Sequence, residues 1–116
     1  MREPIRIRDF SSVVQYADLE DLPDGAATDI DGGYWSGGFS AQCLNRIAPD
    51  GTLIERIPVP APVTMPCFGG PDMKTLFFTS LRDHVGPEVI ERYPLTGSVF
   101  MTRVDIAGLP ITLFAD

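Results

Sequence analysis

Residues 23–51 read PDGAATDIDGGYWSGGFSAQCLNRIAPDG, and this stretch decides the fold. In it, short apolar runs alternate with the turn signals Pro23-Asp24-Gly25, Asp31-Gly32-Gly33 and Pro49-Asp50-Gly51. Pro presets φ for a turn and Gly tolerates positive φ, so these signals separate neighbouring strands. Strands this short and this closely spaced are typical of an all-β protein.

The same alternation extends over the whole chain of 116 residues. Gly and Pro number 11 each, about a fifth of the chain against roughly 12% in average proteins, which makes long helices improbable. The predicted strands are Ile5–Phe10, Val13–Tyr16, Ala26–Ile30, Tyr34–Phe39, Leu44–Ile47, Leu53–Ile57, Met65–Phe68, Thr75–Ser80, Val99–Val104 and Ile111–Phe114.

These strands recur with a period of about 40 residues, which is typical of β-propeller blades. In this interpretation Trp35 and Phe78 hold equivalent places about 43 residues apart. The second unit has a longer connection, Arg82 to Gly97, and such a connection without secondary structure is usually functional or mobile. The sequence therefore predicts two to three blades of four-stranded antiparallel sheets.

The charge balance limits the partners. Nine basic and sixteen acidic side chains give a formal charge of −7, a field that repels phosphate backbones and anionic lipid. Nucleic-acid and membrane binding are therefore not expected. No apolar run approaches the roughly 20 residues of a membrane helix, and the N-terminus lacks a signal-peptide core, so a cytoplasmic protein is expected. Cys43 and Cys67 show no metal-type spacing and are expected to be small buried side chains.

Six separated blocks carry a family resemblance. They are Leu22–Ala27, Asp31–Trp35, Arg46–Gly51, Pro62–Asp72, Leu76–Ser80 and Gly108–Pro110. In order and approximate spacing they resemble the C-terminal part of the gluconolactonase family, which includes regucalcin, also called senescence marker protein. The resemblance covers about residues 20–114.

The resemblance implies part of a six-bladed propeller, about the last two-fifths of such a protein. Residues 1–116 would be a single partial domain. Residues 1–21 would be the outer strands of a preceding blade, residues 22–60 one blade, and residues 61–116 the next.

The resemblance also implies a divalent-metal site at the axial end of the propeller channel. In the family a Glu, an Asn and an Asp from different blades hold the metal, and the Asp of the Pro-Asp-Gly motif corresponds to Asp24. Asp24 would ligate Ca²⁺, or Zn²⁺, Mn²⁺ or Mg²⁺, and would accept a proton from the water that attacks a lactone. Asp24 is thus the expected metal-binding and catalytic residue. The Glu, the Asn and the sugar-binding residues lie upstream in the family and have no counterpart here.

The residues themselves leave another interpretation of Asp24 open. Pro-Asp-Gly is a common turn tripeptide, and the second copy at Asp50 is interpreted as a turn only. Asp29 and Asp31 are also interpreted as turn residues, because an EF-hand loop would need Glu where Ser40 stands. The acidic side chains of residues 18, 20 and 21 could gather a cation with Asp24, or could simply be solvated.

Two functions follow. The first is a gluconolactonase-like, metal-dependent hydrolase of lactones, or the C-terminal part of one. The second is a non-catalytic, truncated propeller module that self-associates through its open blade edges, because a blade buries each face on a neighbour. Whether the chain is an enzyme stays open at this point, with the resemblance favouring a lactonase. The expected partners are a small lactone if the chain is active, and either further copies of the chain or a complementing N-terminal polypeptide.

Overall fold

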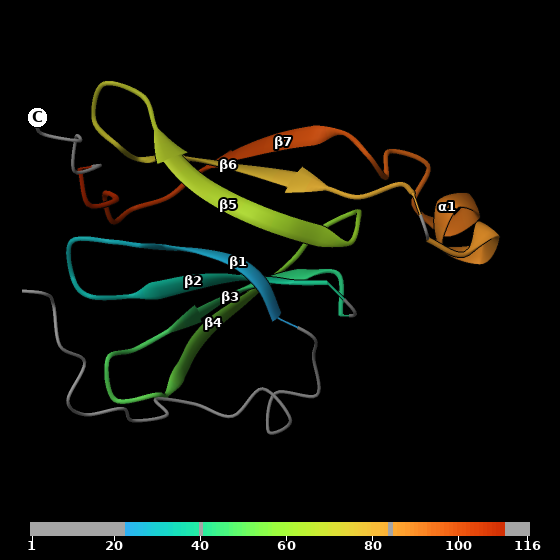
Figure 1. Ribbon diagram of the computed structural model, residues 1–116. Coiled ribbons are helices and arrows are strands. Elements are labelled where there is room, and N and C mark those ends of the chain that lie inside the picture. Colours follow the sequence, from blue (N-terminus) through green and yellow to red (C-terminus); the bar gives the residue numbers. More distant parts are fainter. Residues whose placement is uncertain (1–22, 40, 84, 111–116) are drawn as a thin grey trace, which may run out of the picture.

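Two antiparallel sheets pack against each other in the computed structural model, which describes residues 23–39, 41–83 and 85–110 (Figure 1). The first sheet consists of β1 (Pro23–Thr28), β2 (Tyr34–Gly38), β3 (Cys43–Ile47) and β4 (Leu53–Pro58), in that order. The second consists of β5 (Val63–Gly69), β6 (Thr75–Ser80) and β7 (Val99–Arg103), also in chain order. The prediction of an all-β, partial propeller is confirmed.

Three of the predicted strands, Ile5–Phe10, Val13–Tyr16 and Ile111–Phe114, lie outside the described residues. The division of the chain at residues 1–21, 22–60 and 61–116 therefore stays a prediction.

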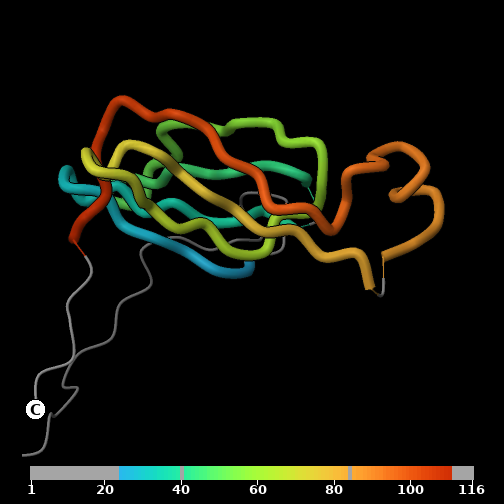
Figure 2. Tube along the Cα trace, turned by 90° about the horizontal axis from the view of Figure 1, so that it is seen from above, coloured from blue at the N-terminus to red at the C-terminus, as the bar shows by residue number. Residues whose placement is uncertain are grey.

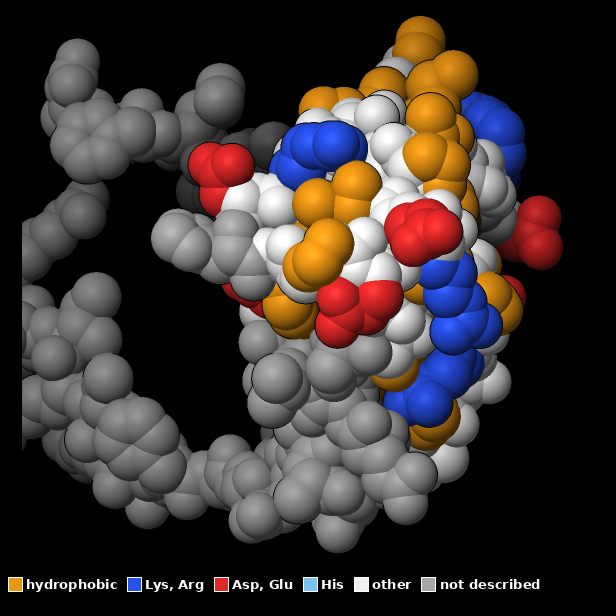
Figure 3. All heavy atoms as spheres, turned by 90° about the vertical axis from the view of Figure 1, so that its right-hand side faces the viewer, with side chains coloured by type: hydrophobic (Ala, Val, Ile, Leu, Met, Phe, Trp, Pro, Cys, Tyr) orange, Lys and Arg blue, Asp and Glu red, His pale blue; other side chains and the backbone are white. Residues whose placement is uncertain are grey.

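The long connection between β6 and β7 contains a short helix, α1 (Pro87–Arg92), which the sequence interpretation missed. Pro87 in the first turn, Glu88 near the N-terminus and Arg92 in the last turn favour this helix. No residue of α1 is buried, and α1 projects beyond the sheets (Figures 1 and 2). Seen from the end of the molecule where α1 lies, hydrophobic side chains are interspersed with acidic and basic ones (Figure 3). No helix within the described ranges is long and apolar enough to cross a membrane.

The core lies between the two sheets. Trp35 and Leu44 of the first sheet pack in one buried cluster with Phe68, Leu76 and Phe78 of the second. The rings of Trp35 and Phe68 meet edge to face, with centroids 6.2 Å apart. Successive side chains of a strand point to opposite faces of the sheet, and this cluster consists of side chains that point toward the other sheet.

Only one cysteine follows the prediction. Cys43 is buried, whereas Cys67 is exposed, and neither forms a disulfide. The reason is strand alternation: Phe68 points into the core, so its neighbour Cys67 points to the opposite face. On that face Cys67 lies directly opposite Phe77 of β6.

The predicted equivalence of Trp35 and Phe78 is wrong by two residues. The pair Thr28↔Tyr34 closes the β1–β2 turn, and Gly69↔Thr75 closes the β5–β6 turn, each over five residues. Trp35 therefore corresponds to Leu76, 41 positions later (76 minus 35). Because side chains alternate with period two, a shift of two leaves the same face buried, so the hydrophobic pattern could not separate the two registers.

After β7 the chain returns from the second sheet to the first. Gly108 forms an isolated antiparallel bridge with Asp29, in the turn between β1 and β2. The Ile30 amide donates to the Ala107 carbonyl at 2.9 Å, and the Leu109 amide donates to the Thr28 carbonyl at 3.0 Å. This return segment, residues 104–109, lies beside the β1–β2 turn in both ribbon views (Figures 1 and 2).

Candidate functional site

The N-terminal end of β1 is irregular, and this irregularity determines how Asp24 is presented. Two residues of β1, Asp24 and Gly25, face a single residue of β2, Gly37. A bulge of this kind bends the strand and redirects a side chain, and such bulges are frequent next to functional sites. Asp24 is exposed at this point.

An equivalent bulge lies at the start of β5. Thr64 and Met65 face a single residue of β6, Thr79. The Thr64 and Thr79 hydroxyls share a hydrogen bond of 2.7 Å. Counted from the bulges, Thr64 of the second sheet stands where Asp24 stands in the first.

The two bulges lie side by side. A Cβ on Gly25 would collide with the Met65 sulfur and would lie 3.0 Å from the Thr64 carbonyl oxygen. Gly25 therefore lets β5 approach β1 closely, as a residue without a side chain must. The Thr64 carbonyl oxygen thus lies beside Gly25, the residue that follows the exposed Asp24.

The described residues around Asp24 do not make a complete metal site. Ca²⁺ takes six to eight oxygen ligands, several of them carboxylates. Within the described part of the chain, no three His, Cys, Asp or Glu side chains gather where they could hold a metal ion. Asp24 is a single exposed carboxylate, and the acidic residues 18, 20 and 21 lie outside the described residues. The described residues therefore do not fit a divalent metal by themselves.

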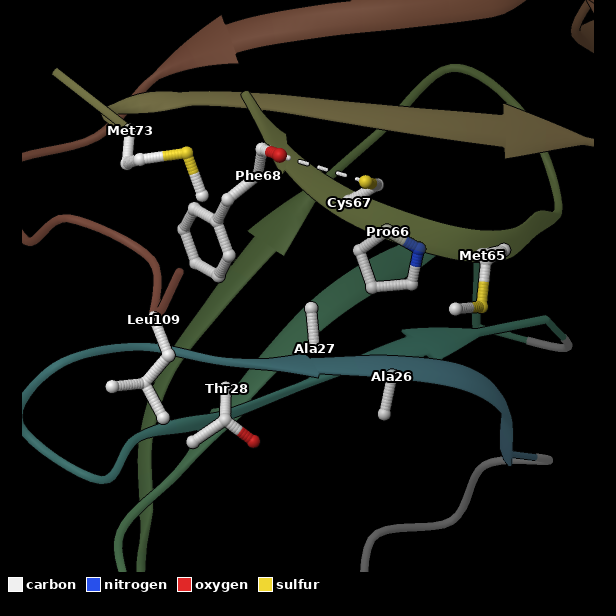
Figure 4. Close-up of a pocket in the computed structure, with 9 residues that line it drawn as sticks. All are labelled: Ala26, Ala27, Thr28, Met65, Pro66, Cys67, Phe68, Met73 and Leu109. Atoms are coloured by element: carbon white, nitrogen blue, oxygen red, sulfur yellow. Dashed lines mark hydrogen bonds between the residues drawn. The ribbon is translucent and has the colours of Figure 1, made fainter. Parts of the chain in front are cut away.

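A groove of about 270 Å³ runs between β1 and β5 (Figure 4). It is lined by Ala26, Ala27, Thr28, Met65, Pro66, Cys67, Phe68, Met73 and Leu109. Met65 lies at one end, near the bulges, and Leu109 lies at the other (Figure 4). None of these nine residues is charged, so the groove suits an apolar occupant rather than a sugar.

At the far end of β1, Asp29 forms a buried cluster that sequence reasoning missed. One carboxylate oxygen accepts from the amides of Asp31 at 3.0 Å and Gly33 at 2.8 Å. The other accepts from Trp35 Nε1 at 2.9 Å and Arg46 Nε at 2.8 Å. Asp29 is fully buried, with an exposed fraction of 0%.

The pKa of Asp29 reflects these contacts. Burial alone would raise it, but hydrogen bonds from Arg46, Trp35 and two backbone amides outweigh burial and hold the pKa below its ordinary value. Asp29 is thus a charged anchor of the β1–β2 turn. It lies at the opposite end of β1 from Asp24 and does not belong to the bulge site. Its sequence signal was a Trp six residues later, whose indole needs an acceptor when buried.

The other acidic candidates behave as turn residues. Asp50 accepts the Thr52 amide at 2.9 Å, and Gly51 has a φ of 91°, which confirms the turn interpretation of the second Pro-Asp-Gly copy. Asp31 is exposed in the β1–β2 turn. His84, the chain's single histidine, lies outside the described residues.

Comparison with known sequences finds a family over most of the chain. Residues 3–82 match the SMP-30/Gluconolactonase/LRE-like region. The 6-deoxy-6-sulfogluconolactonase of Pseudomonas putida is 44% identical over 94 residues, which cover 80% of this chain and 32% of the relative. Regucalcin of Gallus gallus is 31% identical over 113 residues, covering 95% and 38%. The chain spans about a third of the length of the curated relatives it matches.

Solved structures give the same result for the fold. Regucalcin of Agrobacterium tumefaciens, which is described as a calcium-binding protein, superposes with a TM-score of 0.78 at 28% identity. This match covers 85% of the present chain and 34% of that protein. A luciferin-regenerating enzyme superposes with a TM-score of 0.66 at 25% identity, covering 87% and 36%.

Proposed function

Since the chain belongs to the SMP-30/gluconolactonase/LRE-like family, we propose that it is the C-terminal portion of a gluconolactonase-like hydrolase that opens lactones. The observation that supports this proposal is the exposed position of Asp24 on the bulge of β1, next to Gly25, where β5 approaches closely. The name of one relative, the 6-deoxy-6-sulfogluconolactonase, favours the same reaction class.

In the proposed reaction Asp24 acts as the base. Its carboxylate takes a proton from water, and the water oxygen bonds to the lactone carbonyl carbon. The ring C–O bond then breaks, and the ring oxygen takes a proton to become the hydroxyl of a hydroxy acid. The second role proposed for Asp24 is one ligand of a divalent cation, whose other ligands would have to come from outside the described residues.

Two assays on the full chain separate these roles. Asp24→Asn should abolish gluconolactone hydrolysis above the spontaneous rate, since the amide cannot accept the proton. Asp50→Asn is the matched control, because Asp50 lies in an identical tripeptide that forms only a turn. Hydrolysis that is absent from the native chain, or equal in native and Asp24→Asn chains, would overturn the catalytic proposal. Calorimetry with Ca²⁺ and Mn²⁺ on the same variants tests the ligand role independently.

A second candidate function is self-association, favoured by one face of the second sheet. Phe77, Val99 and Met101 point away from the core and are 37%, 68% and 70% exposed. Phe77 lies directly opposite Met101, and Thr79 opposite Val99, so this outer face is continuous across β6 and β7. We propose that a second copy of the chain covers it, because a contiguous apolar sheet face is rarely left in water. The molar mass in solution tests this proposal.

A further inference from the structure

The two sheets have four edge strands, β1, β4, β5 and β7, and three of these hinder pairing with a further strand. β1 begins at Pro23, β4 ends at Pro58 and β5 contains Pro66. Each of these three strands also has an irregular register with its neighbour. Prolines and bulges are devices by which natural sheets keep other chains from pairing with an exposed edge.

The fourth edge strand, β7, has neither device. Its sequence VFMTR contains no proline, and it pairs with β6 without a register shift. The second sheet has three described strands where the first has four, and β7 has no neighbour on its outer side (Figure 1). The one charged residue of β7, Arg103, ends the strand and is paired with Asp72, 3.1 Å from Nη1 to Oδ1. Among the described edges, β7 is therefore the one best suited to accept a further strand.

The backbone of β7 presents a regular set of groups to this open edge. The Val104 amide donates to the Lys74 carbonyl at 2.9 Å, so the backbone groups at this position point toward β6. Residues of an antiparallel strand point their N–H and C=O groups to alternate edges. The groups of Phe100 and Thr102 therefore also point to β6, and those of residues 99, 101 and 103 point to the open edge.

We propose that β7 pairs in antiparallel orientation with β7 of a second copy of the chain, about a two-fold axis at Met101. In this register Met101 lies opposite Met101 of the second copy, and Val99 lies opposite Arg103 of the second copy. All three outward-pointing residues then have partners, and each pair exchanges two hydrogen bonds. A slip of two residues in either direction would leave one of them in each copy without a partner in β7.

The side chains along β7 suit a second copy of the same strand. Val99 and Met101 are 68% and 70% exposed, and this register places Met101 beside the same residue and Val99 beside the alkyl stem of Arg103. No like charges lie opposite each other, because each Arg103 faces a valine. Identical surfaces that meet about a two-fold axis close into a dimer. This inference deepens the self-association proposed above, on which it rests, by naming the contact, and it is independent of any lactonase activity.

Disulfide formation between chains tests the position of the axis. In a Cys67→Ser background, Met101→Cys places two thiols directly opposite each other, with Cα atoms about 5.5 Å apart, within the range for a disulfide. Val99→Cys is the matched control, because Val99 lies on the same face and is equally exposed, but its two copies would be roughly 13 Å apart. We expect about fivefold more disulfide-linked dimer for Met101→Cys. Equal yields would overturn the proposed pairing.

A mixture of two variants tests the register. Val99→Cys chains combined with Arg103→Cys chains, both in the Cys67→Ser background, should form a mixed disulfide, because these positions lie directly opposite each other. Neither variant alone should link to itself with comparable yield. Self-linking of Val99→Cys that matches the yield of the mixture would overturn the register.

Sedimentation velocity of the native chain separates this inference from the self-association on which it rests. A mass that rises with concentration, together with equal disulfide yields for Met101→Cys and Val99→Cys, would overturn the pairing of β7 and leave association through the outer face in place. A constant monomer mass would overturn both.

Hydrogen exchange tests the pairing without cysteines. The Met101 amide should exchange roughly tenfold more slowly at concentrations where the dimer forms than at those where the chain is monomeric, because pairing supplies its acceptor. The Thr102 amide, which points to β6, is the internal control and should change much less. A Met101 amide that exchanges equally slowly in the monomer would show that the edge is already covered, and would overturn the proposal.

Discussion

At the scale of single residues, Asp29 is a fully buried charge in the described structure. Its buried carboxylate accepts four hydrogen bonds, one of them from the guanidinium of Arg46, whose side chain is only 11% exposed. A buried charge of this kind is tolerated because every lone pair it presents is satisfied. The cluster fixes the turn that the return segment then binds.

Asp29→Asn should destabilise the chain by about 3 kcal/mol, because Arg46 would keep its buried charge without a countercharge. Urea denaturation measures the loss of unfolding free energy. Asp31→Asn is the control, because Asp31 is exposed in the same turn and contributes only its backbone amide to the cluster. A difference between the two variants below about 1 kcal/mol would show that the ion pair is not important for stability.

The lowered pKa of Asp29 also predicts how stability depends on pH. Folding favours the charged form, so this stabilisation is fully present above the ordinary value of 3.8 and is lost as the pH falls through the lower pKa of the folded chain. As the pH falls below 3.8, the native chain should therefore lose stability more steeply than Asp29→Asn. Parallel curves of unfolding free energy against pH would contradict this expectation.

Asp72 provides the comparison for that titration. Hydrogen bonds from Arg103 and from the Lys74 amide hold its pKa at about 2. Its ionisation therefore changes the free energy of unfolding with pH in the same direction as that of Asp29. Asp72 and Arg103 are both largely exposed, and solvent screens pairs of this kind. Asp72→Asn should therefore change the acid limb of the stability curve much less than Asp29→Asn does.

The sequence was informative about single residues where local chemistry decides their role. Asp50 could be predicted as a turn residue because Pro and Gly flank it and no other contact is needed. Asp29 could not, since its partners Trp35 and Arg46 reach it only after β2 and β3 have paired. The presentation of Asp24 likewise depends on a bulge that no tripeptide specifies.

At the scale of elements, the return segment is held by close packing. Gly108 lies against the ring of Phe68, and a Cβ at this position would overlap the ring atoms. The same residue donates its amide to the Met73 carbonyl at 2.8 Å. A residue without a side chain is therefore needed where the segment passes between the two sheets.

Gly108→Ala should destabilise the chain by about 2 kcal/mol, because the added methyl group must displace a core ring or the segment itself. Gly86→Ala is the matched control. Its Cβ would meet only the flexible end of Glu88 at 3.1 Å, and the φ of Gly86, −61°, suits any residue. Equal changes in the urea midpoint for the two variants would contradict the packing argument.

Strand positions were predictable because Gly, Pro and Asp punctuate short apolar runs. The predicted strand Thr75–Ser80 agrees with β6, and Tyr34–Phe39 differs from β2 by one residue. The correspondence between positions of the two sheets was not predictable, because a slip of two residues keeps the same face buried. The predicted equivalence of Trp35 and Phe78 illustrates this. The helix α1 was missed because its six residues carry no buried face and hence no apolar period.

For the whole molecule, the decisive feature is the uncovered outer face of the second sheet. The inner face of the same sheet is covered by Trp35 and Leu44 of the first sheet. The outer face carries Phe77, Val99 and Met101, and no described residue packs over it as the first sheet does over the inner face. In a propeller each blade is covered on both faces.

Met101→Lys should abolish the proposed self-association, because each copy would bring a charge into the apolar contact. Sedimentation velocity over a range of micromolar concentrations should show a rising mass for the native chain and a constant monomer mass for the variant. Leu95→Lys is the control, since Leu95 is 58% exposed but lies in the connection after α1. A native chain that stays monomeric would contradict association through this face.

The bridge between Asp29 and Gly108 has a consequence for the order of folding. It joins residues 79 positions apart (108 minus 29), whereas the β1–β2 and β5–β6 turns each close over five residues. Going from a five-residue turn to this separation is about four doublings of loop length, which add about 2.4 kcal/mol to the entropic cost of closing the loop. The local hairpins should therefore form first and the bridge last. A contact made after the transition state slows unfolding without speeding folding, and the final residues to dock therefore set how long the folded chain persists.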